Sequence, residues 1–102
     1  MKRVMVRYKV KADRAEENQK FVEDVYKELH ATAPDGLRYA TFKLEDGVTF
    51  IHVASIETEN GENPLSLTEA FKAFQSDLRD RCEELPVATK LEDVGSYRFF
   101  EF

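Results

Sequence analysis

Polar and apolar side chains alternate over residues 37–56, and the rest of the chain is arranged around this segment. Asp46-Gly47 near its centre favours a tight two-residue turn, in which both positions need positive φ. Counting outward from this turn predicts a β-hairpin in which Thr41 pairs with His52. One face of the hairpin is almost entirely apolar, and the other is mixed but too apolar to be left in water. The first face carries Ala40, Phe42, Ile51 and Val53; the second carries Leu37, Tyr39, Thr41, Phe50, His52, Ala54 and Ile56.

Four further patterns predict the remaining elements. Strict alternation over residues 3–10 is typical of a strand with one buried face. Apolar residues at helical spacing predict one helix that ends before Pro34 and another that ends before Pro86. Residues 89–102 are expected to form a last strand, with Gly95 at a bulge or a point of close approach. The helical stripes are Phe21, Val22, Val25, Tyr26 and Leu29 in the first helix, and Leu67, Phe71, Phe74, Leu78 and Cys82 in the second.

The predicted order is βαββαβ in a single domain of residues 1–102, which is the ferredoxin-like α+β arrangement. Right-handed crossovers place both helices on one face of a four-stranded antiparallel sheet, with the first and third strands in the middle. We expect the helices to cover the face with Val4, Val6, Tyr8, Ala40, Phe42, Ile51 and Val53. The opposite face would carry Met5, Arg7, Tyr39, Thr41, Phe50, His52 and Ala54. Because two helices cannot cover both faces, we expect a homodimer that packs sheet on sheet with two-fold symmetry.

Composition narrows the class of protein. The 102 residues are 42% hydrophobic and 34% charged, as in an ordinary globular domain, and fit one core. The formal net charge of −5 argues against nucleic acid or an anionic membrane surface as a partner. A single cysteine, Cys82, excludes an internal disulfide and a cysteine metal cluster, and it favours a reducing cytoplasmic location. No apolar run is long enough to span a bilayer.

Three stretches carry a resemblance to a known family: GLRYATFKLEDGVTFIHVASI, FKAFQSDLRDRCEELPVATKL and VGSYRF. With the βαββαβ order and the short chain, they resemble the dimeric α+β barrel superfamily, and within it the antibiotic biosynthesis monooxygenase-like small proteins. The resemblance covers essentially the whole chain. It implies a barrel of two facing sheets with a cavity in each subunit. It also implies, for some members, oxidation of aromatic or quinol-type molecules by oxygen without a metal or flavin.

The haem-degrading members of this superfamily resemble one another in an Asn, a Trp and a helical His. This chain has no Trp, and its only histidines are His30, near the end of the first predicted helix, and His52, in a predicted strand. A haem site is therefore disfavoured. We expect no cofactor and no metal.

His52 and Arg7 are the candidate catalytic residues. Imidazole titrates near neutrality, so His52 suits a general base or a hydrogen-bond donor to a phenolate-like substrate. It could equally be a hydrogen-bonded histidine inside a dimer interface. Arg7 could bind a carboxylate or enolate oxygen through its planar guanidinium group, or pair with an acidic residue across the dimer.

The candidate substrate-binding residues are Tyr39, Thr41, Phe50 and Tyr97, with the facing of Tyr97 open because the register of the last strand is ambiguous. Cys82 lies on a helical stripe and is expected to be a small buried apolar residue rather than a nucleophile. The function that the family resemblance implies, with these residues in the site, is cofactor-independent mono-oxygenation of a small aromatic or quinol-type molecule in a pocket. The alternative is a non-enzymatic homodimer that binds a small molecule or serves a structural role.

Overall fold

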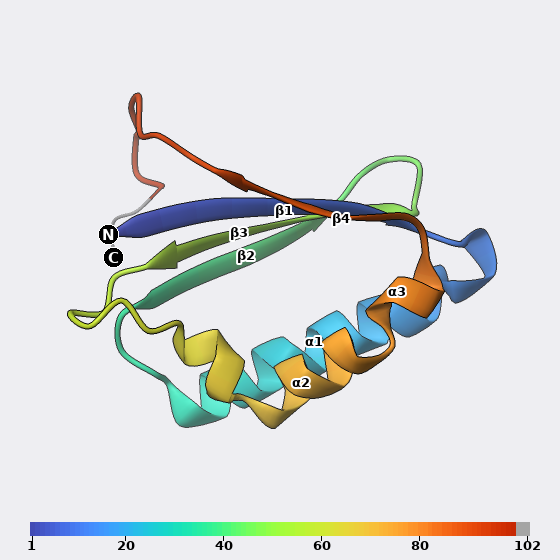
Figure 1. Ribbon diagram of the computed structural model, residues 1–102, viewed down its shortest axis with the longest axis horizontal. Helices are drawn as coiled ribbons and strands as arrows, with labels where there is room; N and C mark the ends of the chain where they lie inside the picture. Colours follow the sequence, from blue (N-terminus) through green and yellow to red (C-terminus); the bar gives the residue numbers. More distant parts are fainter. Residues whose placement is uncertain (100–102) are drawn as a thin grey trace.

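The computed structural model describes residues 1–99, in which one antiparallel sheet carries all the helices on a single side (Figure 1). The strands are β1 (Lys2–Val10), β2 (Leu37–Lys43), β3 (Thr49–Ile56) and β4 (Cys82–Lys90). The helices are α1 (Ala15–Thr32), α2 (Glu69–Ser76) and α3 (Leu78–Arg81), with short 3-10 turns η1 (Ala12–Arg14) and η2 (Pro64–Leu67). The predicted βαββαβ arrangement is confirmed.

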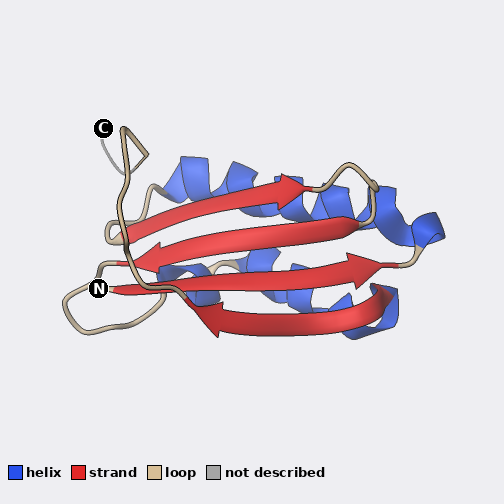
Figure 2. Ribbon diagram, turned by 90° about the horizontal axis from the view of Figure 1, so that it is seen from above, coloured by secondary structure: helices blue, strands red, loops and turns tan. Residues whose placement is uncertain are grey.

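The sheet order is β2-β3-β1-β4, so the first and third strands form the central pair as predicted (Figure 2). The hairpin pairing is also confirmed, because Thr41 lies opposite His52. The prediction of a two-residue turn was wrong, because of Asp46 and Gly47 only Gly47 has a positive φ, at 76°. Instead, the Asp46 carboxylate accepts hydrogen bonds from the backbone N–H groups of Val48 and Thr49, which stabilises a wider loop.

The predicted orientation of the hairpin was wrong. β1 pairs with β3 so that Val6 lies opposite His52 and Met5 lies opposite Val53. Because residues directly opposite each other share a face, the mixed face of the hairpin lies beneath the helices with Tyr8. We call this the inner face. The outer face carries the wholly apolar set of the hairpin (Ala40, Phe42, Ile51 and Val53) together with Met5 and Arg7.

The last strand begins earlier than predicted. Cys82 opens β4 instead of ending a helix, and residues 91–99 follow the strand without regular structure. Residues 100–102 of the predicted strand lie outside the described part of the chain. β4 is an edge strand, where the missing N–H of Pro86 is tolerated, and its pairing with β1 shifts register in this region.

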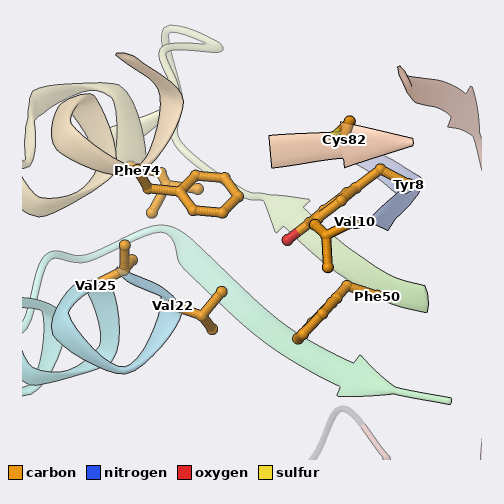
Figure 3. Close-up of a cluster of buried hydrophobic side chains, with 8 residues drawn as sticks. Tyr8, Val10, Val22, Val25, Phe50, Phe74 and Cys82 are labelled. Atoms are coloured by element: carbon orange, nitrogen blue, oxygen red, sulfur yellow. The ribbon is translucent and has the colours of Figure 1, made fainter. Parts of the chain in front are cut away.

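The core lies between the inner face and the helices. Figure 3 shows Tyr8 and Phe50 from the sheet pointing toward Val22 and Phe74 from the helices. The Tyr8 and Phe50 rings stack at a centroid distance of 5.7 Å. Cys82 is buried in the same cluster, as expected for a small apolar side chain, and this burial raises the pKa of its thiol.

Candidate functional site

A cavity of about 330 Å³ lies between the inner face of the sheet and α2. Most of its wall is apolar, and its polar groups come from few side chains, which is typical of a small-molecule site. The exposed residues Lys2 and Gln75 belong to its rim, whereas Tyr8, His52 and Phe74 are buried in its depth. Its lining is Lys2, Val4, Val6, Tyr8, Tyr39, His52, Ala54, Ile56, Asn63, Leu65, Phe71, Phe74, Gln75, Leu78 and Pro86.

His52 is held between two tyrosine hydroxyls in the wall of this cavity. Its Nε2 lies 2.8 Å from the Tyr8 hydroxyl, and its Nδ1 lies 2.5 Å from the Tyr39 hydroxyl. The Thr41 hydroxyl lies 3.2 Å from the same Nδ1 and 2.8 Å from the hydroxyl of Tyr26. Both ring nitrogens therefore have hydrogen-bond partners although the side chain is only 6% exposed.

Two residues of the helical layer extend this network. Asn18 of α1 donates from Nδ2 to the Tyr8 hydroxyl over 2.9 Å, and its Oδ1 accepts from Arg81 Nε over 3.1 Å. Asn18 and Arg81 are completely buried. The result is a continuous chain of hydrogen-bonded polar groups that runs from the buried Arg81 through Asn18, Tyr8 and His52 to the half-buried Tyr39.

Arg81 is an unusual residue for this position because a buried guanidinium needs partners. It lies over the Phe21 ring at 4.5 Å and near the Phe74 ring at 5.3 Å, and its Nη2 donates to the Phe74 carbonyl. Its Nη1 has no hydrogen-bond partner among the described residues; the Asp77 carboxylate lies 3.8 Å away. Burial lowers the pKa of Arg81, and the nearby Asp77 carboxylate opposes this effect.

The titration of the site is governed by burial. Desolvation lowers the pKa of His52 to about 4, so the imidazole is neutral at pH 7. The same effect raises the pKa of Tyr26 to about 12 and moves those of Tyr8 and Tyr39 higher still. The network around His52 is therefore made of uncharged groups at neutral pH, with Arg81 as the one cation that ends it.

The structure brings together only some of the residues singled out from the sequence. His52, Tyr39 and Thr41 lie in one hydrogen-bonded group on the inner face. The prediction that these three residues lie on the outer face was wrong. Arg7 is exposed on the outer face beside Leu85, so the prediction that it lies near His52 was also wrong. The reason is the period of two along β1, which sends Val6 and Arg7 to opposite faces.

The two remaining predicted binding residues also lie away from the cavity. Phe50 shares the inner face with His52, but it is packed in the core against Tyr8 rather than along the cavity wall. Tyr97 is 81% exposed in the segment that follows β4 and does not line the cavity, so its position does not support the predicted role in substrate binding.

Sequence reasoning missed Tyr8, Asn18 and Arg81 as parts of the site. Tyr8 was expected only as a core residue. A signal for Asn18 was present, because it precedes Val22 and Val25 by four and seven residues and so lies on the buried stripe of α1. A polar residue on such a stripe predicts a buried hydrogen-bond partner. The same rule marks Arg81, because it follows Phe74 and Leu78 by seven and three residues on the stripe of the predicted second helix.

Two absences concern the described residues only. Within residues 1–99, no three His, Cys, Asp or Glu side chains are grouped so that they could hold a metal ion. In the same range, every helix is too short or too polar to cross a membrane.

The chain has a ferredoxin-like α+β fold of the kind found in structures named as antibiotic biosynthesis monooxygenases, which confirms the predicted resemblance at the level of the fold. Rv0793 from Mycobacterium tuberculosis superimposes with a TM-score of 0.75 at 12% identity, over 93% of this chain and 96% of that one. A candidate antibiotic biosynthesis monooxygenase from Nitrosomonas europaea superimposes with a TM-score of 0.74 at 14% identity, over 91% of this chain and 89% of that one. Another candidate, from Caulobacter crescentus, has a TM-score of 0.70 at 22% identity, over 92% of this chain and 90% of that one. Neither a family model nor a curated protein matches the sequence.

Proposed function

We propose that the chain binds a small, partly aromatic molecule in the inner cavity and oxidises it with molecular oxygen, as a cofactor-independent monooxygenase. The observation that carries the proposal is a neutral His52, held by two tyrosine hydroxyls, in the wall of an apolar cavity of about 330 Å³. This volume suits a hydroxylated or quinol-type molecule of one or two rings. The names of two similar structures, candidate antibiotic biosynthesis monooxygenases, point to the same chemistry.

In the proposed reaction, His52 accepts a proton from an activated ring carbon through the Tyr8 hydroxyl, which lines the cavity and lies 2.8 Å from Nε2, while the electron pair of that C–H bond passes to oxygen. In the keto tautomer of such a molecule the reacting ring carbon is a CH₂ group, and this group and O₂ give a carbonyl group and water, so atoms and electrons balance. Because burial lowers the pKa of His52 to about 4, the imidazole is neutral at pH 7 and can accept a proton. The imidazolium that forms is acidic enough to return this proton to reduced oxygen. The same low pKa requires a substrate proton that neighbouring aryl or carbonyl groups have already made acidic.

With Arg7 on the outer face, the proposed stabiliser of the developing oxyanion is the Tyr39 hydroxyl. It lies in the cavity wall and is hydrogen-bonded to His52. A donor fixed in a site that excludes water stabilises developing charge more strongly than the same donor in water. Phe71 and Phe74, whose rings stack at 5.8 Å, supply the aromatic part of the wall.

We also propose that two copies pair through the outer face. Phe42 and Val87 on this face are 49% and 62% exposed, and the helices all lie on the other side of the sheet (Figure 1). An apolar sheet face left in water is typical of an interface. The sheet-on-sheet packing predicted from the sequence therefore uses the apolar face of the hairpin, not the face with His52.

A non-enzymatic binding protein is the second candidate, and one observation favours it. Both nitrogens of His52 are already hydrogen-bonded to side chains of the chain itself, as in a residue whose role is to complete a buried network. In that case the cavity would bind the same class of molecule without turnover.

A thermal-shift screen against quinols, hydroxylated aromatics and haem tests binding. A quinol or hydroxylated aromatic at 100 times its Kd should stabilise the fold by about 2.7 kcal/mol and raise the Tm, while haem should not. Oxygen uptake with the ligand found then tests catalysis. Uptake should fall at least about 100-fold in His52→Ala and His52→Gln, as expected for loss of a general base, and should be unchanged in His30→Ala. Equal uptake by all four proteins would remove His52 from the reaction.

A further inference from the structure

We propose that Asn18, held by Arg81, fixes the proton of neutral His52 on Nδ1 and thereby leaves the Tyr39 hydroxyl as a hydrogen-bond donor to the ligand. The cavity would then select molecules with an acceptor oxygen, such as an aromatic ketone or a phenolate. The part that concerns the ligand rests on the proposed function; the part that concerns the proton of His52 does not.

The first step is the orientation of the Asn18 amide. A guanidinium can only donate hydrogen bonds, so the Asn18 atom that faces Arg81 Nε at 3.1 Å must be the carbonyl oxygen. The amide nitrogen is then the atom 2.9 Å from the Tyr8 hydroxyl, and it can only donate. The completely buried Arg81 thus removes the usual ambiguity of an Asn side chain.

The second step follows from the capacity of a tyrosine hydroxyl, which has one proton to donate and also accepts hydrogen bonds. Because Tyr8 accepts from Asn18, its own proton is free for the remaining neighbour, His52 Nε2, at 2.8 Å. Nε2 is then the acceptor nitrogen of a neutral imidazole, which places the ring proton on Nδ1.

The opposite tautomer satisfies fewer groups. With the proton on Nε2, both His52 and Asn18 would donate to Tyr8, and the proton of Tyr8 would have no hydrogen-bond acceptor among the described side chains. Tyr8 is 2% exposed, and a buried donor without a partner is unfavourable. Tyr39 is half-buried and has the Thr41 hydroxyl as a second hydrogen-bond partner, so its proton has an alternative acceptor.

The third step concerns the ligand. When His52 Nδ1–H donates to the Tyr39 oxygen at 2.5 Å, the proton of Tyr39 is not needed by His52 and can turn from the neighbouring Thr41 hydroxyl to a bound molecule. Tyr39 lines the cavity, so that proton can be donated to a bound molecule. Asn18 does not line the cavity and is therefore a positioning residue, which acts through Tyr8 and His52.

NMR of the unliganded protein tests the proton position directly. With only two histidines in the chain, long-range ¹H–¹⁵N correlations at pH 7 can assign each ring, and His30 serves as the internal reference. We expect His52 to carry its proton on Nδ1. A spectrum with the proton on Nε2 would overturn the proposal without any variant.

Asn18→Asp tests the role of Asn18. An aspartate would accept from both Arg81 Nε and the Tyr8 hydroxyl, so Tyr8 could no longer donate to His52, and the His52 proton should move to Nε2. Asn60→Asp makes the same change of charge in an exposed loop and should leave His52 unchanged. A folded Asn18→Asp protein that keeps the proton on Nδ1 would refute the assignment; if this variant does not fold, the wild-type spectrum decides.

Binding of 1-tetralone and tetralin tests the ligand preference, since only the first has an acceptor oxygen. Wild type should bind 1-tetralone about fivefold more tightly, the effect of one neutral hydrogen bond. Tyr39→Phe should abolish this preference, whereas Tyr26→Phe, which removes a hydroxyl outside the cavity lining, should keep it. Equal binding by wild type would refute the preference. Binding of neither molecule would remove the proposed ligand cavity and the preference with it, while the spectrum still decides the tautomer.

Discussion

Burial of His52 links the stability of the fold to pH. Its surroundings are the hydroxyls of Tyr8, Tyr39 and Thr41 and the ring of Phe74, and none of its hydrogen-bond partners among the described residues is a carboxylate that could stabilise an imidazolium. The pKa of His52 is lowered from 6.5 to about 4, so the unfolded chain binds a proton between these values and the folded chain does not. Stability from this group is therefore present above pH 6.5 and is lost as the pH falls toward 4.

We expect His52 to make the wild type about 2 kcal/mol less stable at pH 5 than at pH 7.5, from the cited pKa values. His52→Gln should lack this component, because glutamine does not titrate. Denaturant unfolding of both proteins at the two pH values measures the difference. His30→Gln, which changes an exposed histidine, should behave like wild type; an identical pH response of wild type and His52→Gln would contradict a buried neutral imidazole.

At the scale of elements, α2 forms the wall of the cavity opposite the sheet, and α1 holds it in place. The Glu28 carboxylate of α1 accepts hydrogen bonds from the first backbone N–H groups of α2, those of Glu69 and Ala70, at 3.1 and 2.8 Å. A carboxylate at a helix N-terminus satisfies free N–H groups and interacts favourably with the helix dipole. The α1–α2 contact is thus fixed by one side chain as well as by apolar packing.

Glu28→Ala should destabilise the fold by about 1 kcal/mol, as expected for loss of a helix cap. Glu23→Ala is the matched control: it removes a carboxylate of the same helix whose partner is the neighbouring Gln19, and it should change stability by less than about 0.5 kcal/mol. The free energy of unfolding in urea measures both effects. Equal values for the two variants would show that Glu28 does not cap α2.

At the scale of the whole molecule, the sheet carries large apolar side chains on both faces but has helices on only one. The proposed dimer would cover the outer face, part of which already lies under residues 91–99: Leu91 N donates to the Arg3 carbonyl, Arg3 pairs with Asp93, and Phe99 lies beside Val53. A partner would therefore pack on the remaining apolar surface around Phe42 and Val87.

We expect light scattering at micromolar concentration to give twice the chain mass for wild type. Phe42→Glu should give a folded monomer, because a charge in an apolar interface is unfavourable when it is not paired. Leu67→Glu places the same change on an exposed residue of η2, away from the sheet, and should remain dimeric. A wild-type monomer would refute the sheet-on-sheet dimer.

The sequence by itself determined the order of elements, the pairing within the hairpin and the apolar character of both sheet faces. These follow from local rules: the period of two in a strand, the period of 3.6 in a helix, and turn residues at fixed positions. These rules did not predict the start of β4, because the apolar spacing that ends at Cys82 also fits a helix. Pro86 indicates the end of an element unless its strand is known to lie at the edge of the sheet.

Only the tertiary structure decided which face of the hairpin meets the helices. Alternation fixes which residues lie together, but not which of two apolar faces is turned inward. The helices supply Asn18 and Arg81, which complete the hydrogen bonds of Tyr8 and His52. Burying the mixed face therefore costs less free energy than burying the same polar groups without partners. This choice moved His52 and Tyr39 into the cavity, and left Arg7 outside it.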